Sequence, residues 1–175
     1  MTIQIEKTTS SRLATLDFSA IEFGNVFSDH LFRQEWKDGT WQDPTIIPHQ
    51  SIALSPAALG LHYGQVVFEG LKAYRGTHDN VIRLFRPDRN AKRLQESCER
   101  LCIPTVTTDD FLDAVRALAS LEQDWVPPSR LQTLYLRPIL FGSEGHLAVR
   151  PAQTYEFLIL AAPVSEYFDR EGPGI

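Results

Sequence analysis

Two residues, Tyr135 and Arg137, have the types and the spacing to bind a carboxylate. They lie in the apolar run LYLRPILF at residues 134–141, which is typical of a β-strand. Residues i and i+2 of a strand project from the same face of the sheet. A hydroxyl and a guanidinium side by side can hold a carboxylate. The alternative is an exposed polar pair on the surface of the strand, with no ligand.

Phosphate binding is suggested by a second group of side chains, the arginines at positions 83, 86, 89 and 93. The guanidinium keeps its proton and matches two phosphate oxygens at once, so arginine is well suited to bind phosphate. Composition does not choose among these arginines. A solvated surface arginine is the default interpretation for each of them.

A glycine-rich stretch at residues 59–76 precedes both groups. Gly64, Gly70 and Gly76 recur at six-residue spacing. Glycine is used where the backbone turns sharply or passes close to a ligand. The simpler interpretation of this stretch is a tight turn that leads into a strand.

The wording of the stretch is specific. The run LHYGQVVFEGLKAY at residues 61–74 resembles the signature at the start of the small domain of branched-chain amino-acid aminotransferases. These are class IV, D-alanine-aminotransferase-like enzymes that use pyridoxal 5'-phosphate (PLP). The resemblance extends from Phe23 to Phe168. It implies amino-group transfer between leucine, isoleucine or valine and 2-oxoglutarate, with PLP as the cofactor of the full-length enzyme.

The resemblance gives one arginine of the group a cofactor role. Arg93 directly precedes Leu94 in the run FRPDRNAKRL at residues 85–94, which matches the family. In class IV enzymes the arginine before this leucine binds the PLP phosphate. Helical periodicity places Arg93 only on the flank of an apolar stripe, so its role depends on the resemblance.

Further positions are implied to bind substrate. Tyr63 and Phe68 match residues that line the pocket for the branched side chain of the substrate. Aromatic and apolar walls favour a side chain that fills the pocket and excludes water from it. Without the motif, ordinary core packing would be an equally good interpretation of Phe68. Family members use the Tyr135 and Arg137 pair for the acidic second substrate. Tyr167 matches a tyrosine at the junction between domains that borders the same pocket.

The chain departs from the family in one respect. The family's catalytic lysine, which holds PLP as a Schiff base and moves the Cα proton, belongs to a second domain. None of the lysines, at positions 7, 37, 72 and 92, fits that position. We therefore expect no catalytic residue in this chain, a missing large domain, and no catalysis by the chain alone. Residues 169–175, which end in GPGI, are expected to begin the interdomain linker.

The resemblance also implies partners. These are branched-chain amino acids, 2-oxo acids, the missing large domain and a second subunit of a homodimer, over whose site the loop at residues 145–149 would reach. Two other interpretations stay open. One is a class IV relative of another specificity, such as a D-amino-acid aminotransferase or aminodeoxychorismate lyase, and the other is a binding or assembly module without catalysis. The long lead-in and the wording FEGLKAY favour the branched-chain enzyme.

Helices and hairpins must position these residues. Apolar residues spaced by three and four predict a helix over residues 87–101, with a stripe from Ala91 to Leu101. A second helix is predicted from a capping Thr108 to the Pro127-Pro128 pair.

Hairpins are predicted at residues 66–86 and around the turn KDGT at residues 37–40, and a short strand at residues 51–54. Helices and strands that do not alternate regularly predict an α+β domain. We expect two layers, a mainly antiparallel sheet with helices on one side, as in the small domain of D-amino-acid-aminotransferase-like PLP enzymes. This domain is expected at residues 23–168, after a mobile lead-in at residues 1–22.

Bulk properties exclude several classes of protein. Hydrophobic residues at 43% and charged residues at 22% are ordinary for soluble domains. A net charge of −5 argues against nucleic-acid binding. No run approaches the ~18 apolar residues of a membrane span, and no signal peptide is recognisable, so we expect a cytoplasmic protein without membrane contact. Cys98 and Cys102 are predicted to be reduced core cysteines, because no histidine cluster completes a metal site.

Overall fold

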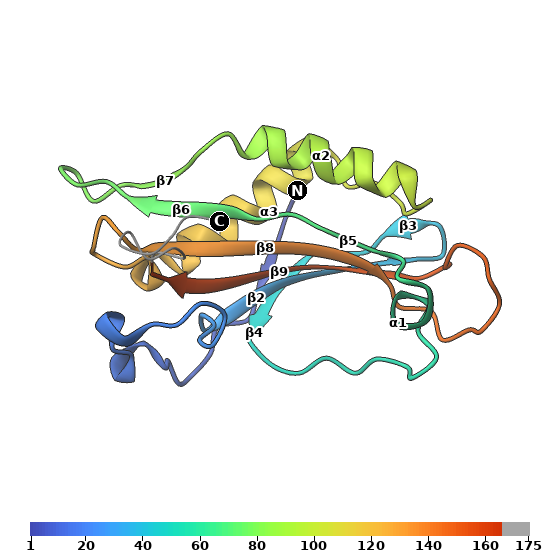
Figure 1. Cartoon of the computed structure of the whole chain (residues 1–175), viewed down its shortest axis with the longest axis horizontal. Coiled ribbons are helices and arrows are strands. Elements are labelled where there is room, and N and C mark those ends of the chain that lie inside the picture. The colour runs from blue at the N-terminus through green and yellow to red at the C-terminus, as the bar shows by residue number, and fades with distance from the viewer. Residues whose placement is uncertain (166–175) are drawn as a thin grey trace, which may run out of the picture.

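One sheet with two helices packed against it forms the framework of the chain (Figure 1). The computed structural model describes residues 1–165. The strands of this part are β1 (Gln4–Ile5), β2 (His30–Lys37), β3 (Thr40–Trp41), β4 (Thr45–Pro48), β5 (Val66–Phe68), β6 (Leu71–Arg75), β7 (Ile82–Leu84), β8 (Thr133–Gly142) and β9 (Tyr155–Val164). Their order is β1-β4-β2-β9-β8-β6-β7, with β3 paired to β2 and β5 paired to β8. Only β1 and β4 pair in parallel, which confirms the predicted α+β class with a mainly antiparallel sheet.

The two long helices, α2 (Pro87–Arg100) and α3 (Thr108–Leu121), lie on one side of the sheet (Figure 1). The predicted stripe of α2 is buried at Leu94 and Cys98, but Leu101 follows the helix and is exposed. Among the described residues, no helix is long and apolar enough to cross a bilayer. The short helices are α1 (Leu59–Tyr63), η1 (Leu13–Thr15), η2 (Phe18–Ala20) and η3 (Gln123–Trp125).

The N-terminal cap of α3 differs from the prediction by one residue. The capping side chain is that of Thr107, whose hydroxyl accepts a hydrogen bond from the Asp110 amide at 3.1 Å. Thr108 is already the first helical residue. Both threonines carry the same hydroxyl, so the sequence alone did not distinguish between them.

The central strands β8 and β9 position the carboxylate-binding candidates. They pair along their full length of ten residues. Leu134, Leu136 and Leu140 of β8 are buried in the core, whereas Tyr135 and Arg137 are half-buried on the opposite face. The spacing of i and i+2 therefore places the hydroxyl and the guanidinium together, as predicted.

The predicted hairpin at residues 37–40 joins β2 to β3. Asp38 and Gly39 have φ angles of 54° and 77°, the left-handed values that a two-residue hairpin turn uses. Trp36 lies opposite Trp41, with ring centroids 5.4 Å apart. The aromatic residues on either side of the turn therefore pack together, and the predicted hairpin is confirmed.

The predicted strand at residues 51–54 is wrong. The strand in this region is β4, which pairs with β2, and residues 51–54 lie in no strand. Pro48 is the last residue of β4, a position where the missing N–H of proline does not interrupt the hydrogen bonds of the strand. The predicted run at residues 66–75 is divided into β5 and β6, which pair with β8 in one continuous register. Between them the Glu69 amide donates to the Pro138 carbonyl at 2.9 Å, but Pro138 has no N–H to donate in return.

Cys98 and Cys102 have different environments. Both are free cysteines, but only Cys98 is buried, and Cys102 is exposed. Burial raises the pKa of the Cys98 thiol to about 12. Cys102 follows the end of α2 in a left-handed conformation, with φ of 54°, which turns the chain and carries its side chain out of the core. The prediction of two core cysteines is therefore wrong for Cys102.

Residues 1–22, the predicted lead-in, make specific contacts with the start of β2. The Thr8 amide donates to Nε2 of His30 at 2.8 Å. The Arg12 amide donates to a carboxylate oxygen of Asp29 at 3.0 Å. Strand β1 adds a backbone pairing with β4. The mobility of this segment stays a prediction.

Candidate active site

Arg137 contacts two aromatic residues, Tyr135 on its own strand β8 and Phe68 on the paired strand β5. Its Nε and Nη2 donate to the Tyr135 hydroxyl at 3.0 and 2.8 Å. Its guanidinium carbon lies 4.5 Å from the ring centroid of Phe68, where a cation is attracted to the ring face. Pairing of β5 with β8 brings Phe68 beside this part of β8. In the described residues Nη1 of Arg137 has no hydrogen-bond acceptor, so the pair can receive a carboxylate.

Gly70 makes room for the Tyr135 side chain. A Cβ added at residue 70 would collide with the Tyr135 hydroxyl and lie 3.0 Å from the adjacent ring carbon. Only glycine allows so close an approach of the β5–β6 connection to this ring. Glycine at position 70 is therefore explained by packing against Tyr135, and the approach of this backbone to a ligand stays a prediction.

A cationic hollow of about 520 Å³ lies beside Gly70 and Tyr135. Arg86, Arg89 and Arg93 line it. Arg83, the remaining arginine of the group, instead pairs with Asp79 at the tip of the hairpin. The structure therefore separates arginines that the sequence left equivalent. The other lining residues are Leu71, Lys72, Tyr74, Phe85 and Asn90.

Arg93 reaches the hollow while paired with Glu69. Its Nε and Nη2 each donate to a carboxylate oxygen of Glu69 at 2.8 Å. This hydrogen-bonded carboxylate raises the pKa of Arg93. Nothing in the sequence pattern indicated the pair, because the two residues are 24 positions apart and belong to different elements.

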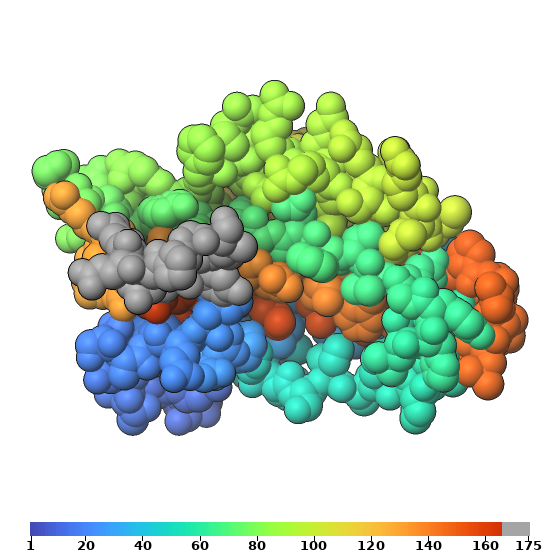
Figure 2. All heavy atoms as spheres, in the orientation of Figure 1, coloured from blue at the N-terminus to red at the C-terminus, as the bar shows by residue number. Residues whose placement is uncertain are grey.

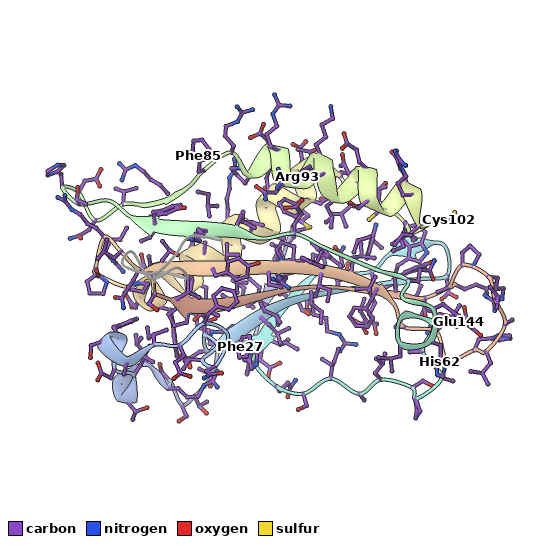
Figure 3. The ribbon with its side chains drawn as sticks, in the orientation of Figure 1. Phe27, His62, Phe85, Arg93, Cys102 and Glu144 are labelled. Atoms are coloured by element: carbon purple, nitrogen blue, oxygen red, sulfur yellow. The ribbon has the colours of Figure 1, made fainter. Side chains whose placement is uncertain are left out.

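A smaller, apolar hollow of about 190 Å³ borders Tyr135 and Arg137 as well. Phe23 and Phe27 form part of its wall, and the ring centroids of Phe23 and Tyr135 are 5.5 Å apart. Figure 3 shows Phe27 on the opposite side of the sheet from Arg93 and Phe85. Tyr135 therefore lies between a cationic hollow and an apolar one. The remaining wall is formed by Gly24, Leu160, Ala162 and Val164.

Phe23 and Phe27 were not predicted as site residues. They are more than a hundred positions from Tyr135 in the chain, so periodicity carries no signal for their proximity.

The space-filling view shows atoms of the orange and red central strands between the blue-to-cyan lower segments and the green upper layer (Figure 2).

Tyr63 lies apart from the other predicted residues. It belongs to α1, and its hydroxyl donates to the Leu147 carbonyl at 2.5 Å. It lines a separate hollow with Leu101 and Cys102, and no contact joins it to Phe68 in the part of the chain that the structure describes. Its pocket role stays a prediction. Tyr167 lies outside the described residues.

Comparison with curated proteins identifies relatives over nearly the whole chain. The chain is 42% identical over 172 residues, 98% of its length, to branched-chain-amino-acid aminotransferase 2 of Bacillus subtilis (strain 168). The chain is homologous to branched-chain-amino-acid aminotransferases. A further relative, branched-chain-amino-acid transaminase 1 of the same organism, is 42% identical over 153 residues, 87% of the chain. No family model matches the chain.

The chain spans about half the length of the curated aminotransferases it matches, 47% and 43% for the two Bacillus subtilis proteins. The aminotransferase of Mycolicibacterium smegmatis (strain ATCC 700084 / mc(2)155) is 41% identical over 83% of the chain, which covers 40% of that protein. The homology therefore concerns part of a longer aminotransferase sequence.

Solved aminotransferase structures share the fold. The Escherichia coli branched-chain amino acid aminotransferase superposes with a TM-score of 0.60 at 22% identity, over 79% of this chain and 42% of that one. The enzyme of Thermoproteus uzoniensis, solved with norvaline, gives a TM-score of 0.59 at 22% identity, over 79% of this chain and 43% of that one. Each superposition covers less than half of the solved aminotransferase chain.

Proposed function

We propose that the chain is the small-domain portion of a PLP-dependent transaminase that exchanges an amino group between leucine, isoleucine or valine and 2-oxoglutarate. The observation that carries this proposal is the 42% identity over 98% of the chain to a branched-chain-amino-acid aminotransferase. Another solved branched-chain amino acid aminotransferase, with a TM-score of 0.53, is complexed with N-(5'-phosphopyridoxyl)-L-glutamate, a cofactor–substrate conjugate.

The cationic hollow fits the phosphate of this cofactor. PLP supplies an electron-withdrawing ring when bound, while the protein supplies charge and orientation. Arg93 uses Nε and Nη2 for Glu69 and keeps three further N–H groups for a second acceptor. Arg86 and Arg89 add positive charge at the same hollow. We assign Arg93 as the phosphate ligand, with the neighbouring arginines as electrostatic support.

The Tyr135 and Arg137 pair fits a substrate carboxylate. Nη1 of Arg137, which has no acceptor within residues 1–165, offers a charge-assisted hydrogen bond. The Tyr135 hydroxyl can donate its own proton while it accepts from Arg137. Phe68 lies over the guanidinium and excludes water from one side. The apolar wall with Phe23 suits a hydrocarbon side chain, because filling it removes methyl groups from water.

We further propose that the lysine that holds the cofactor belongs to a second domain and is none of the lysines of this chain. The chain alone would then not catalyse transamination. Lys72 is the lysine to test, because it lines the same hollow as Arg93. Lys92 pairs with Glu96 on the surface of α2, and Lys37 belongs to the hairpin β2–β3. The proposed protein is cytoplasmic and dimeric, as expected from the family resemblance.

The experiment is borohydride reduction of the chain with PLP, followed by peptide mass analysis and an assay of leucine with 2-oxoglutarate. We expect no stoichiometric pyridoxyl label on any lysine and no glutamate formed. A Lys72→Arg variant provides the control for random labelling. Stoichiometric labelling of Lys72 together with leucine-dependent glutamate formation would show that the chain is a transaminase by itself.

A further inference from the structure

Both carboxylate oxygens of Glu69 accept hydrogen bonds beside the cationic hollow. Its side chain is only 10% exposed, although its partner Arg93 is 57% exposed. One carboxylate oxygen accepts from Nε of Arg93, and the other accepts from Nη2 of Arg93 and from the Asn90 side chain, each at 2.8 Å. A carboxylate with this many donors has little freedom to rotate.

Asn90 ties this carboxylate to the backbone at Gly70. It is 7% exposed and lies three residues before Arg93 on the same face of α2. Its amide nitrogen donates to Glu69 Oε2 at 2.8 Å and to the Gly70 carbonyl at 3.1 Å. Gly70 in turn is the position whose missing side chain accommodates the Tyr135 hydroxyl.

We infer that Glu69 and Asn90 are positioning residues that hold Arg93 with its terminal edge toward the hollow, and set its spacing from the Tyr135 and Arg137 pair. This inference rests on the proposed function, in which Arg93 binds the cofactor phosphate. The side-on pairing with Glu69 uses Nε and Nη2 and leaves the Nη1 and Nη2 edge for a bidentate contact with phosphate oxygens.

The direction in which Glu69→Gln changes the affinity for phosphate distinguishes a positioning role of Glu69 from a purely electrostatic one. Glu69 places a negative charge beside a site for an anion, so its removal would strengthen phosphate binding if charge alone mattered. A positioning role predicts the reverse, because an unpaired arginine on the surface must lose side-chain freedom when it binds phosphate. Glu69→Gln keeps the size of the side chain but offers Arg93 only one acceptor oxygen.

The test measures binding of pyridoxine 5'-phosphate, which lacks the aldehyde and cannot react with lysine. We expect Glu69→Gln and Asn90→Leu each to weaken its binding to the 175-residue chain about three- to tenfold. Glu96→Gln is the matched control: Glu96 acts on Arg93 through charge alone and lies on the same helix. It should leave the affinity unchanged or raise it by about twofold at low salt.

Arginine side-chain NMR supplies a second readout that a merely structural role would not change. In the wild-type chain the Arg93 Nε–H should exchange slowly with solvent, because it is bonded to a nearly buried carboxylate. Glu69→Gln and Asn90→Leu should speed this exchange in addition to any fall in the thermal midpoint that the lost hydrogen bonds cause. A lower midpoint with unchanged affinity and exchange would show a purely structural role and overturn the inference.

The outcomes for the inference and for the proposed function differ. If Arg93→Gln abolishes phosphate binding but Glu69→Gln leaves it unchanged or strengthens it, the function stands and the inference is overturned. If the wild-type chain does not bind the phosphate and Arg93→Gln changes nothing, the cofactor role of Arg93 fails, and the inference fails with it.

Discussion

At the scale of single residues, the location of the Tyr135 hydroxyl requires that residue 70 has no side chain. Gly70 lies so close to the Tyr135 ring that a Cβ there would overlap the hydroxyl. The sequence predicted the Tyr135 and Arg137 pair from their spacing, because i and i+2 on a strand share a face. It did not predict the roles of Gly70 or Glu69, since contacts between different elements leave no local pattern.

Gly70→Ala should therefore destabilise the chain by forcing Tyr135 out of its position. We expect a loss of about 1–3 kcal/mol in the free energy of unfolding, the usual cost of overpacking. Urea unfolding measures it. In a Tyr135→Phe background the loss should be smaller, because the hydroxyl that makes the closest clash is gone. Equal losses in both backgrounds would contradict this contact.

Asp29 should make the free energy of unfolding of the chain depend on pH in the acidic range. Burial would raise the pKa of Asp29, but the hydrogen bonds from the Arg12 amide, the Ser11 hydroxyl and the Trp125 indole outweigh it and hold this pKa below its ordinary value. Because the pKa is depressed in the folded state, its stabilisation is present above pH ~4 and is lost as the pH falls through the folded-state value.

Asp29→Asn is the variant that checks this assignment. We expect it to cost about 1–3 kcal/mol at pH 7, because the charge-assisted hydrogen bonds are lost. Its unfolding free energy should also fall less than that of the wild-type chain between pH 5 and pH 3, as measured by urea unfolding. The same acid dependence in both proteins would show that other carboxylates are responsible.

At the scale of elements, periodicity predicted the helices and strands well but not their limits. Helix α2 and strand β8 match their apolar patterns closely, because their buried residues repeat every three to four and every two positions, respectively. The strand near residue 51 was misplaced, because a few apolar residues between prolines fit several registers. The interruption between β5 and β6 was missed, because it lies opposite Pro138 of β8, which has no N–H for the ladder, and the pairing of these strands cannot be read from a local pattern.

The cap of α3 offers a test of such a boundary. Thr107→Ala should lower the free energy of unfolding by about 1 kcal/mol, because the Asp110 amide loses its acceptor. Thr108→Ala is the matched control and should cost less, since Thr108 is the first residue inside the helix. Thermal or urea unfolding compares the two. A larger loss for Thr108→Ala would place the cap where the sequence alone had suggested.

At the scale of the whole molecule, large apolar side chains remain exposed around the site. Phe68 is 61% exposed and Phe85 is 80% exposed, and both border the cluster of arginines and aromatic rings. Contiguous apolar surface on a small domain usually finds a partner. The family resemblance implied a missing large domain, but only the structure shows which rings are exposed.

The chain should therefore self-associate in a concentration-dependent way. Sedimentation velocity over a wide range of protein concentrations measures this association. Phe85→Ser should weaken it, because the most exposed of these rings is removed. Val81→Ser, a smaller exposed apolar residue in the loop before β7, serves as the control and should have less effect. A monomer at every concentration would contradict this account of the surface.

The central claim is that this chain contributes the phosphate-binding part of a transaminase site. The most direct measurement is an NMR titration of the chain with pyridoxine 5'-phosphate and, separately, with pyridoxine. We predict that the phosphate ester shifts resonances around the hollow of Gly70, Lys72 and Arg93, that pyridoxine does not, and that Arg93→Gln removes the effect. Equal shifts with both compounds, or shifts in α1 that Arg93→Gln leaves unchanged, would contradict the claim.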